Sequence, residues 1–204
     1  MYLDNDWGTY PFVTASTVLT GGANAGCGIP PMAINRVIGV MKAYTTRVGA
    51  GPFPTELMDD TGVTLQKVGQ EFGATTGRAR RCGWLDLVMI RFAAQINGYT
   101  DMALTKLDIL DEFEEIKICT GYTLKEKTVD YFDCDAYNLF SVKPVYRKVK
   151  GWKQSTRGIT EYEKLPDAAK NYIREIKEFT GVPVGIISTG PERREIIVRQ
   201  QFSK

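Results

Sequence analysis

The chain has 204 residues, of which 43% are hydrophobic and 25% are charged. This composition is ordinary for a globular protein and excludes an intrinsically disordered one, while the length allows one large domain or two small ones. The net charge of +2 gives the chain as a whole no attraction for nucleic acid or a membrane surface, so any basic site must be local.

Residues that usually carry redox, metal or proton chemistry are scarce. The cysteines Cys27, Cys82, Cys119 and Cys134 lie far apart without a CxxC pair, which favours reduced thiols over a zinc or disulfide framework. The chain has no histidine, so proton transfer near neutral pH would use a carboxylate or a group from elsewhere. No apolar run of about 18 residues and no signal peptide are found, so we expect a cytoplasmic protein without a membrane span.

The first 56 residues alternate between strand-like and loop-like stretches. β-branched and aromatic residues predict a strand over 9–17, and glycines with two prolines predict a loop over 20–31. The prolines also favour a short helix that starts after them, over 32–39. Residues 40–48 are strand-like, and glycines and prolines predict another loop over 49–56.

The middle of the chain is predicted to hold two helices around an arginine-rich loop. Residues 62–73 have a moderately amphipathic pattern that is typical of a helix. Residues 73–84 contain few apolar side chains and are predicted to form a loop. Residues 85–98 are apolar around much of the helical circumference, which predicts a buried helix closed by Gly98.

The clearest helix is predicted over 165–181. Pro166 lies near its first turn, apolar residues recur at helical spacing, and Gly181 follows its last turn. Strands are predicted around Leu104, over 115–124 and 129–133 as a hairpin or meander, over 182–190, and over 195–200.

This order of elements predicts an α/β protein in which a mixed β-sheet is flanked by helices. We expect residues 1–204 to form a single domain or part of one, with a β-rich insert at about 114–150. No internal repeat or linker suggests a further division.

Arginines gather in the stretch "GATTGRARR". Gly77 lets the backbone approach a ligand, Thr75 and Thr76 offer hydroxyl groups, and arginine forks suit carboxylates and phosphates. This composition is typical of an anion-binding loop. A solvated basic loop, or an ion-pair cluster with Glu71 and Asp86, explains the same residues.

The stretch "TRVGAGPFPTE" comes at the end of a predicted strand. Gly49 and Gly51 free the backbone there, so the loop could seat a ligand. A tight turn between layers explains the glycines equally, because no dinucleotide fingerprint follows them.

Two further stretches suggest recognition of a base. If the strand continues through them, Lys106 and Asp108 lie on the same side of it. Asp108 could then accept hydrogen bonds from the guanine N1–H and 2-amino groups, while the lysine stem lies over the purine. An exposed ion pair explains them too. Ser188, Thr189 and Gly190 follow another buried strand, as part of a base pocket or as an ordinary turn. No GxxxxGK[ST] phosphate loop occurs in the chain.

Six stretches, in this order and spacing, resemble adenylosuccinate synthetases: "GTYPFVTAS", "KAYTTRVGAGPFPTE", "EFGATTGRARRCGWLD", "LTKLDILD", "LPDAAKNYI" and "STGPERRE". Those enzymes are about twice as long, so the chain is similar to their C-terminal half. The resemblance implies part of a P-loop-NTPase-like fold and of a cytoplasmic, homodimeric ligase. That ligase joins L-aspartate to IMP, with GTP as co-substrate and Mg²⁺ as cofactor, in the synthesis of AMP.

The resemblance also assigns ligands to residues of this chain. IMP would contact Thr14, Val48 and Arg78. Aspartate would contact Ala74, Thr75, Thr76, Gly77, Arg78, Ala79 and Arg80. GTP would contact Arg80, Lys106, Leu107, Asp108, Ser188, Thr189 and Gly190.

In this family the phosphate loop, the catalytic aspartate and histidine, and the magnesium ligands belong to the N-terminal half. We therefore expect no catalytic residue and no metal ligand among these residues, and an isolated chain that is incomplete and inactive. A non-catalytic guanine-nucleotide-binding module is the alternative. RNA binding through Arg78 to Arg81 is less favoured, because no aromatic residues are interleaved with the arginines.

Overall fold

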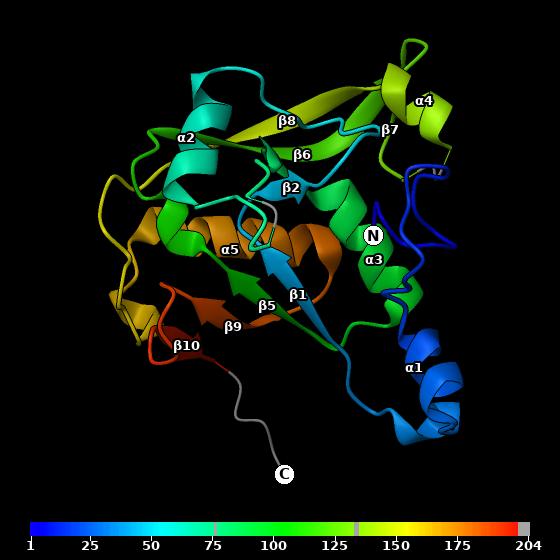
Figure 1. The fold of residues 1–204 in the computed structure, drawn as a ribbon. Helices are drawn as coiled ribbons and strands as arrows, with labels where there is room; N and C mark the ends of the chain where they lie inside the picture. Colours follow the sequence, from blue (N-terminus) through cyan, green and yellow to red (C-terminus); the bar gives the residue numbers. More distant parts are fainter. Residues whose placement is uncertain (76, 133–134, 200–204) are drawn as a thin grey trace.

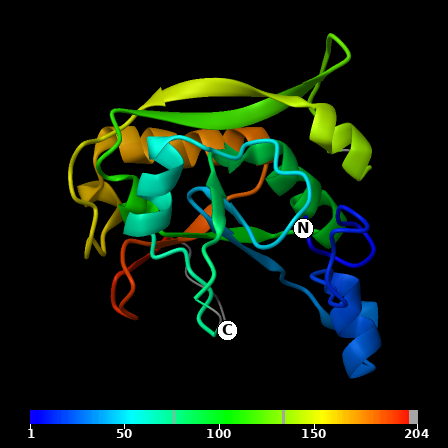
Figure 2. The ribbon, with the colours of Figure 1, turned by 45° about the horizontal axis from the view of Figure 1, so that its top comes forward.

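Two β-sheets form the outer layers of the fold, and a pair of helices lies between them (Figures 1 and 2). The computed structural model describes residues 1–75, 77–132 and 135–199. Sheets with both parallel and antiparallel strands, packed on helices, make this an α/β protein and confirm the predicted fold class.

The first sheet has three parallel strands, β1 (Ile38–Lys42), β5 (Asp101–Thr105) and β9 (Val184–Ser188). The fourth strand, β10 (Ile196–Val198), pairs antiparallel with β9. The order across the sheet is β1–β5–β9–β10, so β1 is an edge strand within the described residues. The strands predicted around Leu104, over 182–190 and at the end of the chain are confirmed.

The second sheet is built around the long strand β6 (Glu115–Leu124). The short strand β4 (Leu85–Asp86) runs parallel to β6, whereas β7 (Lys127–Val129) and β8 (Lys143–Lys150) run antiparallel to it. Helix α4 (Ala136–Ser141) precedes β8. The predicted hairpin is therefore present, but the range of its second strand is wrong: β7 precedes the predicted 129–133 except at Val129, and residues 130–132 are not in a strand. Residue 133 lies outside the described residues.

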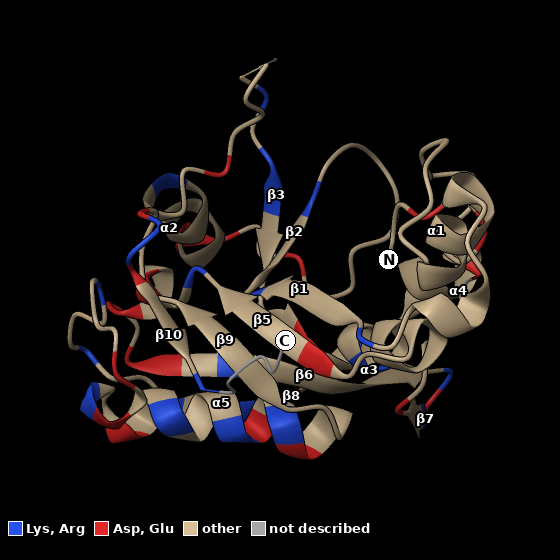
Figure 3. Ribbon diagram, turned by 90° about the horizontal axis from the view of Figure 1, so that it is seen from below, with Lys and Arg blue, Asp and Glu red and all other residues tan. Residues whose placement is uncertain are grey.

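The inner helices are α3 (Leu87–Asn97) and α5 (Asp167–Thr180), which contact each other. Helix α5 also contacts β8 and β9, so it joins the two sheets. Its opposite face carries the charged residues seen along α5 in Figure 3. The buried side chains of α5 recur every three or four residues, each stabilising the fold by about 1.5–3 kcal/mol if large and apolar. They are Ala169, Tyr172, Ile173 and Ile176.

Both inner helices end as their sequences predict. Gly98 after α3 and Gly181 after α5 have left-handed backbones, with φ of 63° and 73°. The phenol of Tyr172 donates a hydrogen bond of 2.5 Å to the carbonyl of Ala43, which fixes α5 against the end of β1. No helix of the described residues is long and apolar enough to cross a bilayer.

Shorter elements connect the layers. Strand β2 (Thr45–Arg47) pairs antiparallel with β3 (Arg81–Gly83), and α2 (Asp60–Val68) lies between them in the sequence. Helix α1 (Thr20–Cys27) follows the N-terminal segment. Single 3₁₀ turns occur at Pro31–Ala33, Leu107–Leu110 and Tyr162–Lys164.

The strand predicted over 9–17 is absent, because its amide groups bond to the segment that precedes it. The N–H groups of Thr9 and Thr14 donate to the carbonyls of Tyr2 and Leu3 at 2.9 and 3.0 Å. Asp4 accepts hydrogen bonds from the backbone N–H groups of Asp6, Trp7 and Val18 at 3.0, 2.9 and 2.7 Å. The segment is therefore wound around Asp4 in turns, and it has no neighbouring strand in the described structure.

The loop predicted over 20–31 is also wrong, because 20–27 form α1. Its first N–H, from Thr20, donates a 2.7 Å hydrogen bond to the side chain of Asn97 at the end of α3. A contact across 77 residues thus starts a glycine-containing helix that has low intrinsic propensity. The helix predicted over 32–39 is replaced by a 3₁₀ turn and the start of β1.

Three other predicted ranges need smaller corrections. The strand predicted over 40–48 is divided into β1 and β2 by Ala43 and Tyr44. Within the loop predicted over 73–84, residues 81–83 form β3. The helix predicted over 62–73 is α2, which begins at Asp60 and ends at Val68. Gln70 then has a left-handed backbone, with φ of 51°, so the chain turns away before Glu71.

Candidate functional site

The carboxyl ends of the three parallel strands meet at one edge of the first sheet. Lys42 is the last residue of β1, Lys106 follows β5, and Ser188 is the last residue of β9. In open α/β sheets, ligands bind outside this edge, where loops from different strands converge. Parallel pairing therefore brings together sequence motifs that lie at the ends of three separate strands.

A hollow of about 300 Å³ opens at this edge. It brings together Lys106 and Asp108 with Gly190, which come from two separate sequence motifs. Its other lining residues are Val68, Gly69, Gln70, Ile109, Arg157 and Pro191. A larger open groove of about 720 Å³ runs along Lys150, Trp152 and Asn171, but it contains none of the predicted site residues.

Lys106 and Asp108 are not two positions of one strand, as the sequence suggested. Strand β5 ends at Thr105, Lys106 has a left-handed backbone with φ of 61°, and a 3₁₀ turn begins at Leu107. This turn still brings both charged residues to the hollow. Leu107 is fully buried in the core, main chain included, and is not one of the residues that line the hollow.

The Asp108 carboxyl is half-buried and lines the hollow. Within the described structure, no side chain donates a hydrogen bond to it. Burial raises the pKa of Asp108, Asp111 raises it further, and Arg157 acts in the opposite direction. A carboxylate with acceptor capacity left over is suited to a ligand that presents N–H groups.

The turn after β9 is held by its own contacts. Ser188 donates from Oγ to the carbonyl of Gly190 at 2.8 Å, and Thr189 donates from Oγ1 to the carbonyl of Ile159 at 2.8 Å. Thr189 is fully buried, so its hydroxyl serves the fold. A Cβ on Gly190 would lie 2.2 Å from Oε2 of Glu195, so a larger residue here would have to displace the Glu195 carboxylate.

The arginine-rich loop projects from the body of the protein between α2 and β3 (Figure 3). Its base is closed by a bridge between Phe72 and Ala79 and by the Gly73 N–H, which donates to the carbonyl of Arg78 at 2.8 Å. Thr76 lies outside the described residues. The predicted residues with exposed positions in this loop are Ala74, Thr75, Gly77, Arg78 and Ala79.

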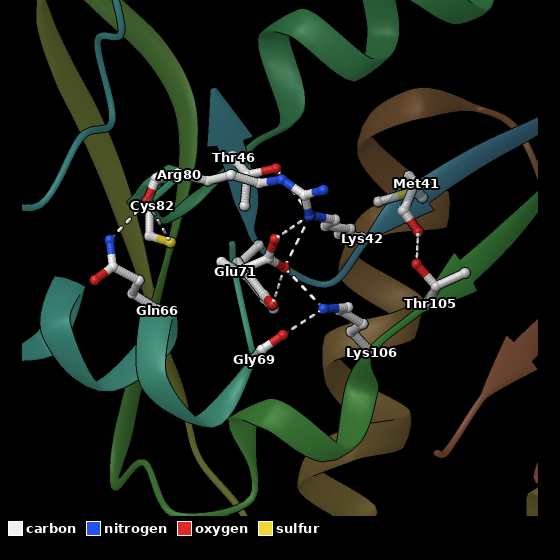
Figure 4. Close-up of polar contacts among 11 residues, drawn as sticks. Met41, Lys42, Thr46, Gln66, Gly69, Glu71, Arg80, Cys82, Thr105 and Lys106 are labelled. Atoms are coloured by element: carbon white, nitrogen blue, oxygen red, sulfur yellow. Dashed lines mark hydrogen bonds and ion pairs between the residues drawn. The ribbon is translucent and has the colours of Figure 1, made fainter. Parts of the chain in front are cut away.

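One buried carboxylate at the base of this loop collects three cations (Figure 4). Glu71 is fully buried, and its oxygens accept hydrogen bonds from Lys42 at 2.8 and 2.9 Å. Arg80 donates at 2.8 Å and Lys106 at 2.9 Å. The hydroxyl of Tyr44 donates at 2.5 Å.

The charge state of Glu71 follows from these donors. Burial alone would raise its pKa, but hydrogen bonds from Lys42, Tyr44, Arg80 and Lys106 lower the pKa of Glu71 to about 2. Glu71 is therefore ionised near neutral pH. The ion pair of Arg80 with Glu71 matches one alternative interpretation of the loop, whereas Arg81 pairs with Glu56 instead.

Thr14 and Val48 lie on two segments that a buried arginine joins. Arg47 donates to Thr9 Oγ1 at 2.9 Å and to the carbonyl of Phe12 at 3.0 Å, and it also contacts the carbonyls that follow β2. Thr14 is exposed, and its hydroxyl donates a hydrogen bond of 3.1 Å to the carbonyl of Leu3. Val48 is 55% exposed.

Sequence reasoning did not select three of the residues that shape the site: Lys42, Arg157 and, except as an ion-pair partner, Glu71. The one available signal was the position of Lys42 in a predicted strand. In the structure Lys42 ends β1, which runs parallel to β5, the strand before Lys106. Nothing in the sequence placed Arg157 beside Asp108 in the hollow.

Comparison with known proteins identifies the relatives of the chain. The family model "Adenylosuccinate synthetase" matches residues 1–197. The chain belongs to the adenylosuccinate synthetase family. Adenylosuccinate synthetases of Schizosaccharomyces japonicus and Neisseria meningitidis serogroup C are each 53% identical to it, over 199 and 198 residues, which are 98% and 96% of this chain.

The chain spans about half the length of the adenylosuccinate synthetases it matches, since it covers 46% of each of these two proteins. The solved structure of a fully ligated adenylosuccinate synthetase from Plasmodium falciparum has the same fold, with a TM-score of 0.94 and 40% identity. That match covers 98% of this chain and 48% of the other. In the described part of this chain, no cluster of three His, Cys, Asp or Glu residues could hold a metal ion.

Proposed function

We propose that this chain supplies the guanine-binding and aspartate-binding residues, and part of the IMP site, of an adenylosuccinate synthetase. This ligase joins L-aspartate to IMP with GTP as the energy donor, yielding adenylosuccinate, GDP and phosphate, in AMP synthesis. The observation that carries the proposal is the hollow in which Lys106, Asp108 and Gly190 meet. Membership of the family supports it.

The chemistry of the hollow favours guanine. The Asp108 carboxylate accepts the hydrogen bonds of guanine N1–H and the 2-amino group, which adenine does not present as a pair. The stem of Lys106 lies along the purine, and the turn of Ser188, Thr189 and Gly190 contributes backbone groups. Leu107 and Thr189 are fully buried, so in this proposal they shape the wall of the GTP site from beneath.

The exposed arginine loop suits the dicarboxylate substrate. In this proposal, Arg78 contacts aspartate and IMP, Arg80 contacts aspartate or GTP, and Ala74 to Gly77 and Ala79 complete the loop. Thr14 and Val48 contact IMP. Mg²⁺ and the catalytic residues would be held by parts of the enzyme beyond the matched half, and the whole enzyme would act as a cytoplasmic homodimer.

These 204 residues are proposed to be inactive alone. The outer face of the first sheet carries exposed apolar side chains, with Val40 74% and Val198 49% exposed. Within the described residues, β1 pairs with β5 on one side and with no strand on the other. Such surfaces are expected where another part of an enzyme packs. IMP- and aspartate-dependent GTP hydrolysis by the isolated chain tests this, and robust turnover would contradict it.

Guanine specificity is tested by binding to the 204-residue chain. We expect guanosine to bind more tightly than adenosine, and Asp108→Asn to weaken guanosine by about tenfold or more, because a hydrogen-bonded charge is lost. The same variant should favour xanthosine, whose 2-position is an oxygen. Equal affinity of the wild type for guanosine and adenosine would refute the guanine site. It would also remove the support for the alternative function, a non-catalytic guanine-nucleotide-binding module.

A further inference from the structure

A single side chain links the arginine loop to the hollow. Glu71 stands at the base of the loop, where its carbonyl accepts the N–H of Arg80 at 2.9 Å. Its carboxylate reaches both the guanidinium of Arg80 and the ammonium of Lys106. The two cations come from segments proposed to bind different ligands, yet they share the same acceptor (Figure 4).

Each of these cations is only partly covered. The side chains of Lys42, Arg80 and Lys106 are 26%, 31% and 33% exposed, whereas Glu71 is fully buried. Their charged groups thus contact Glu71, while part of each side chain remains exposed. One carboxylate against three cations also leaves an excess of positive charge, which suits an anionic ligand.

Lys106 depends on this contact for its conformation. A left-handed backbone is unfavourable for a residue with a side chain and persists only where its surroundings hold it. The ammonium of Lys106 is held by two acceptors, the carbonyl of Gly69 at 2.5 Å and the carboxylate of Glu71 at 2.9 Å. Both acceptors belong to the segment between α2 and the arginine loop.

We propose that Glu71 is a positioning residue that holds Arg80 and Lys106 in their binding geometry together, so that the arginine loop and the guanine hollow are energetically coupled. This inference rests on the proposed function, because it concerns the same two ligand-binding segments. Glu71 does not contact a ligand in this scheme. It acts through the two cations that do.

Glu71→Gln in the 204-residue chain separates positioning from plain electrostatics. Removing one negative charge makes the cluster more positive, so electrostatics alone would tighten GTP binding. If Glu71 positions Lys106, the variant should instead bind both guanosine, which is uncharged, and GTP about tenfold more weakly. Urea unfolding and far-UV circular dichroism verify that the variant is folded at the assay temperature.

Glu56→Gln is the matched control, because Glu56 forms the neighbouring ion pair with Arg81 and is not placed in either site. It should change neither affinity by more than about twofold, as expected for a part-exposed pair.

The coupling between the arginine loop and the hollow is measured by a second pair of variants. Arg80→Gln should weaken GTP binding about tenfold in the wild-type chain and less than about twofold in the Glu71→Gln variant. The second effect is smaller because an Arg80 side chain that Glu71 no longer holds contributes little to binding.

Should Glu71→Gln not fold, Glu71→Asp keeps the charge and shortens the reach by one methylene, and guanosine binding should fall about fivefold. Unchanged guanosine affinity in a folded Glu71 variant, or tighter GTP binding, would overturn the positioning role while the guanine site stands. A wild type that does not prefer guanosine would overturn the proposed function, and the inference with it.

Discussion

Two buried carboxylates in this protein have opposite surroundings. Glu71, at the edge of the first sheet, is surrounded by Lys42, Arg80 and Lys106, and its pKa falls to about 2. Asp86, before α3, accepts hydrogen bonds from the phenols of Tyr2 and Tyr122 at 2.8 and 2.6 Å. Burial raises the pKa of Asp86, and these neutral donors only partly offset it.

The difference separates a candidate binding region from a structural one. The cations around Glu71 are partly exposed, so they can serve an incoming anion as well as the fold. The partners of Asp86 are themselves buried: Tyr2 is 6% exposed and Tyr122 is 1% exposed. Asp86 also caps α3 by accepting the N–H of Met89 at 3.1 Å.

The largest expected effect comes from removing Glu71. Glu71→Ala leaves three cations without their shared carboxylate, so the free energy of unfolding at pH 7 should fall by about 3 kcal/mol, the lower end for a broken buried pair. Urea denaturation measures this change. Glu56→Ala should cost less than Glu71→Ala, because Glu56 pairs with one cation, Arg81, and both side chains are part-exposed; equal losses in the two variants would contradict the central role of Glu71.

Acidification should affect the two carboxylates in opposite directions. The folded pKa of Glu71 is lowered from 4.5 to about 2, so its stabilisation is present above about pH 4.5 and is lost as the pH falls toward 2. The stability gap between wild type and Glu71→Gln should therefore shrink by about 3 kcal/mol over this window. Urea unfolding at a series of pH values measures the gap.

The pKa of Asp86 is raised above 3.8, so the folded state binds its proton more readily than the unfolded chain. Wild type should consequently gain stability relative to Asp86→Asn as the pH falls through the folded pKa. Parallel pH dependence of the two gaps would show that the environments are not opposite.

Removing one phenol from each carboxylate should have unequal effects. Tyr122→Phe should lower the free energy of unfolding by about 2 kcal/mol, because Asp86 then keeps only one phenol donor. Tyr44→Phe should cost about 1 kcal/mol, since Glu71 retains three cationic donors. Thermal unfolding of the two variants ranks them, and a larger loss in Tyr44→Phe would reverse the comparison.

The smallest effect is expected at Arg157, which touches neither carboxylate. Its side chain is 63% exposed, and its nitrogen lies 3.7 Å from Glu195. Arg157→Ala should change the free energy of unfolding by less than about 0.5 kcal/mol, as exposed pairs contribute little. Guanosine titration of the same variant reveals whether Arg157 acts in the hollow that it lines.

Local patterns in the sequence were sufficient for the elements whose stability is mostly local or periodic. The spacing of Ala169, Tyr172, Ile173 and Ile176 predicted α5, and Gly98 and Gly181 predicted two helix ends. The motifs around Lys106 and Gly190 were likewise visible, and the order of strands and helices was enough to predict an α/β fold.

The tertiary structure decided what depends on distant contacts. The side chain of Asn97 accepts the first N–H of α1. The N–H groups of Thr9 and Thr14, in a segment whose β-branched residues predicted a strand, donate to the carbonyls of Tyr2 and Leu3. Lys106 turns out of its strand into a left-handed conformation, and its ammonium donates to Gly69 and Glu71. The partners of Glu71 lie 29, 9 and 35 residues away in the sequence, so no local pattern assembles them. Parallel pairing of β1 with β5 brings Lys42 and Lys106 to the same end of the sheet. Arg80 is brought beside Glu71 by the bridge between Phe72 and Ala79 and by its own N–H, which donates to the Glu71 carbonyl at 2.9 Å.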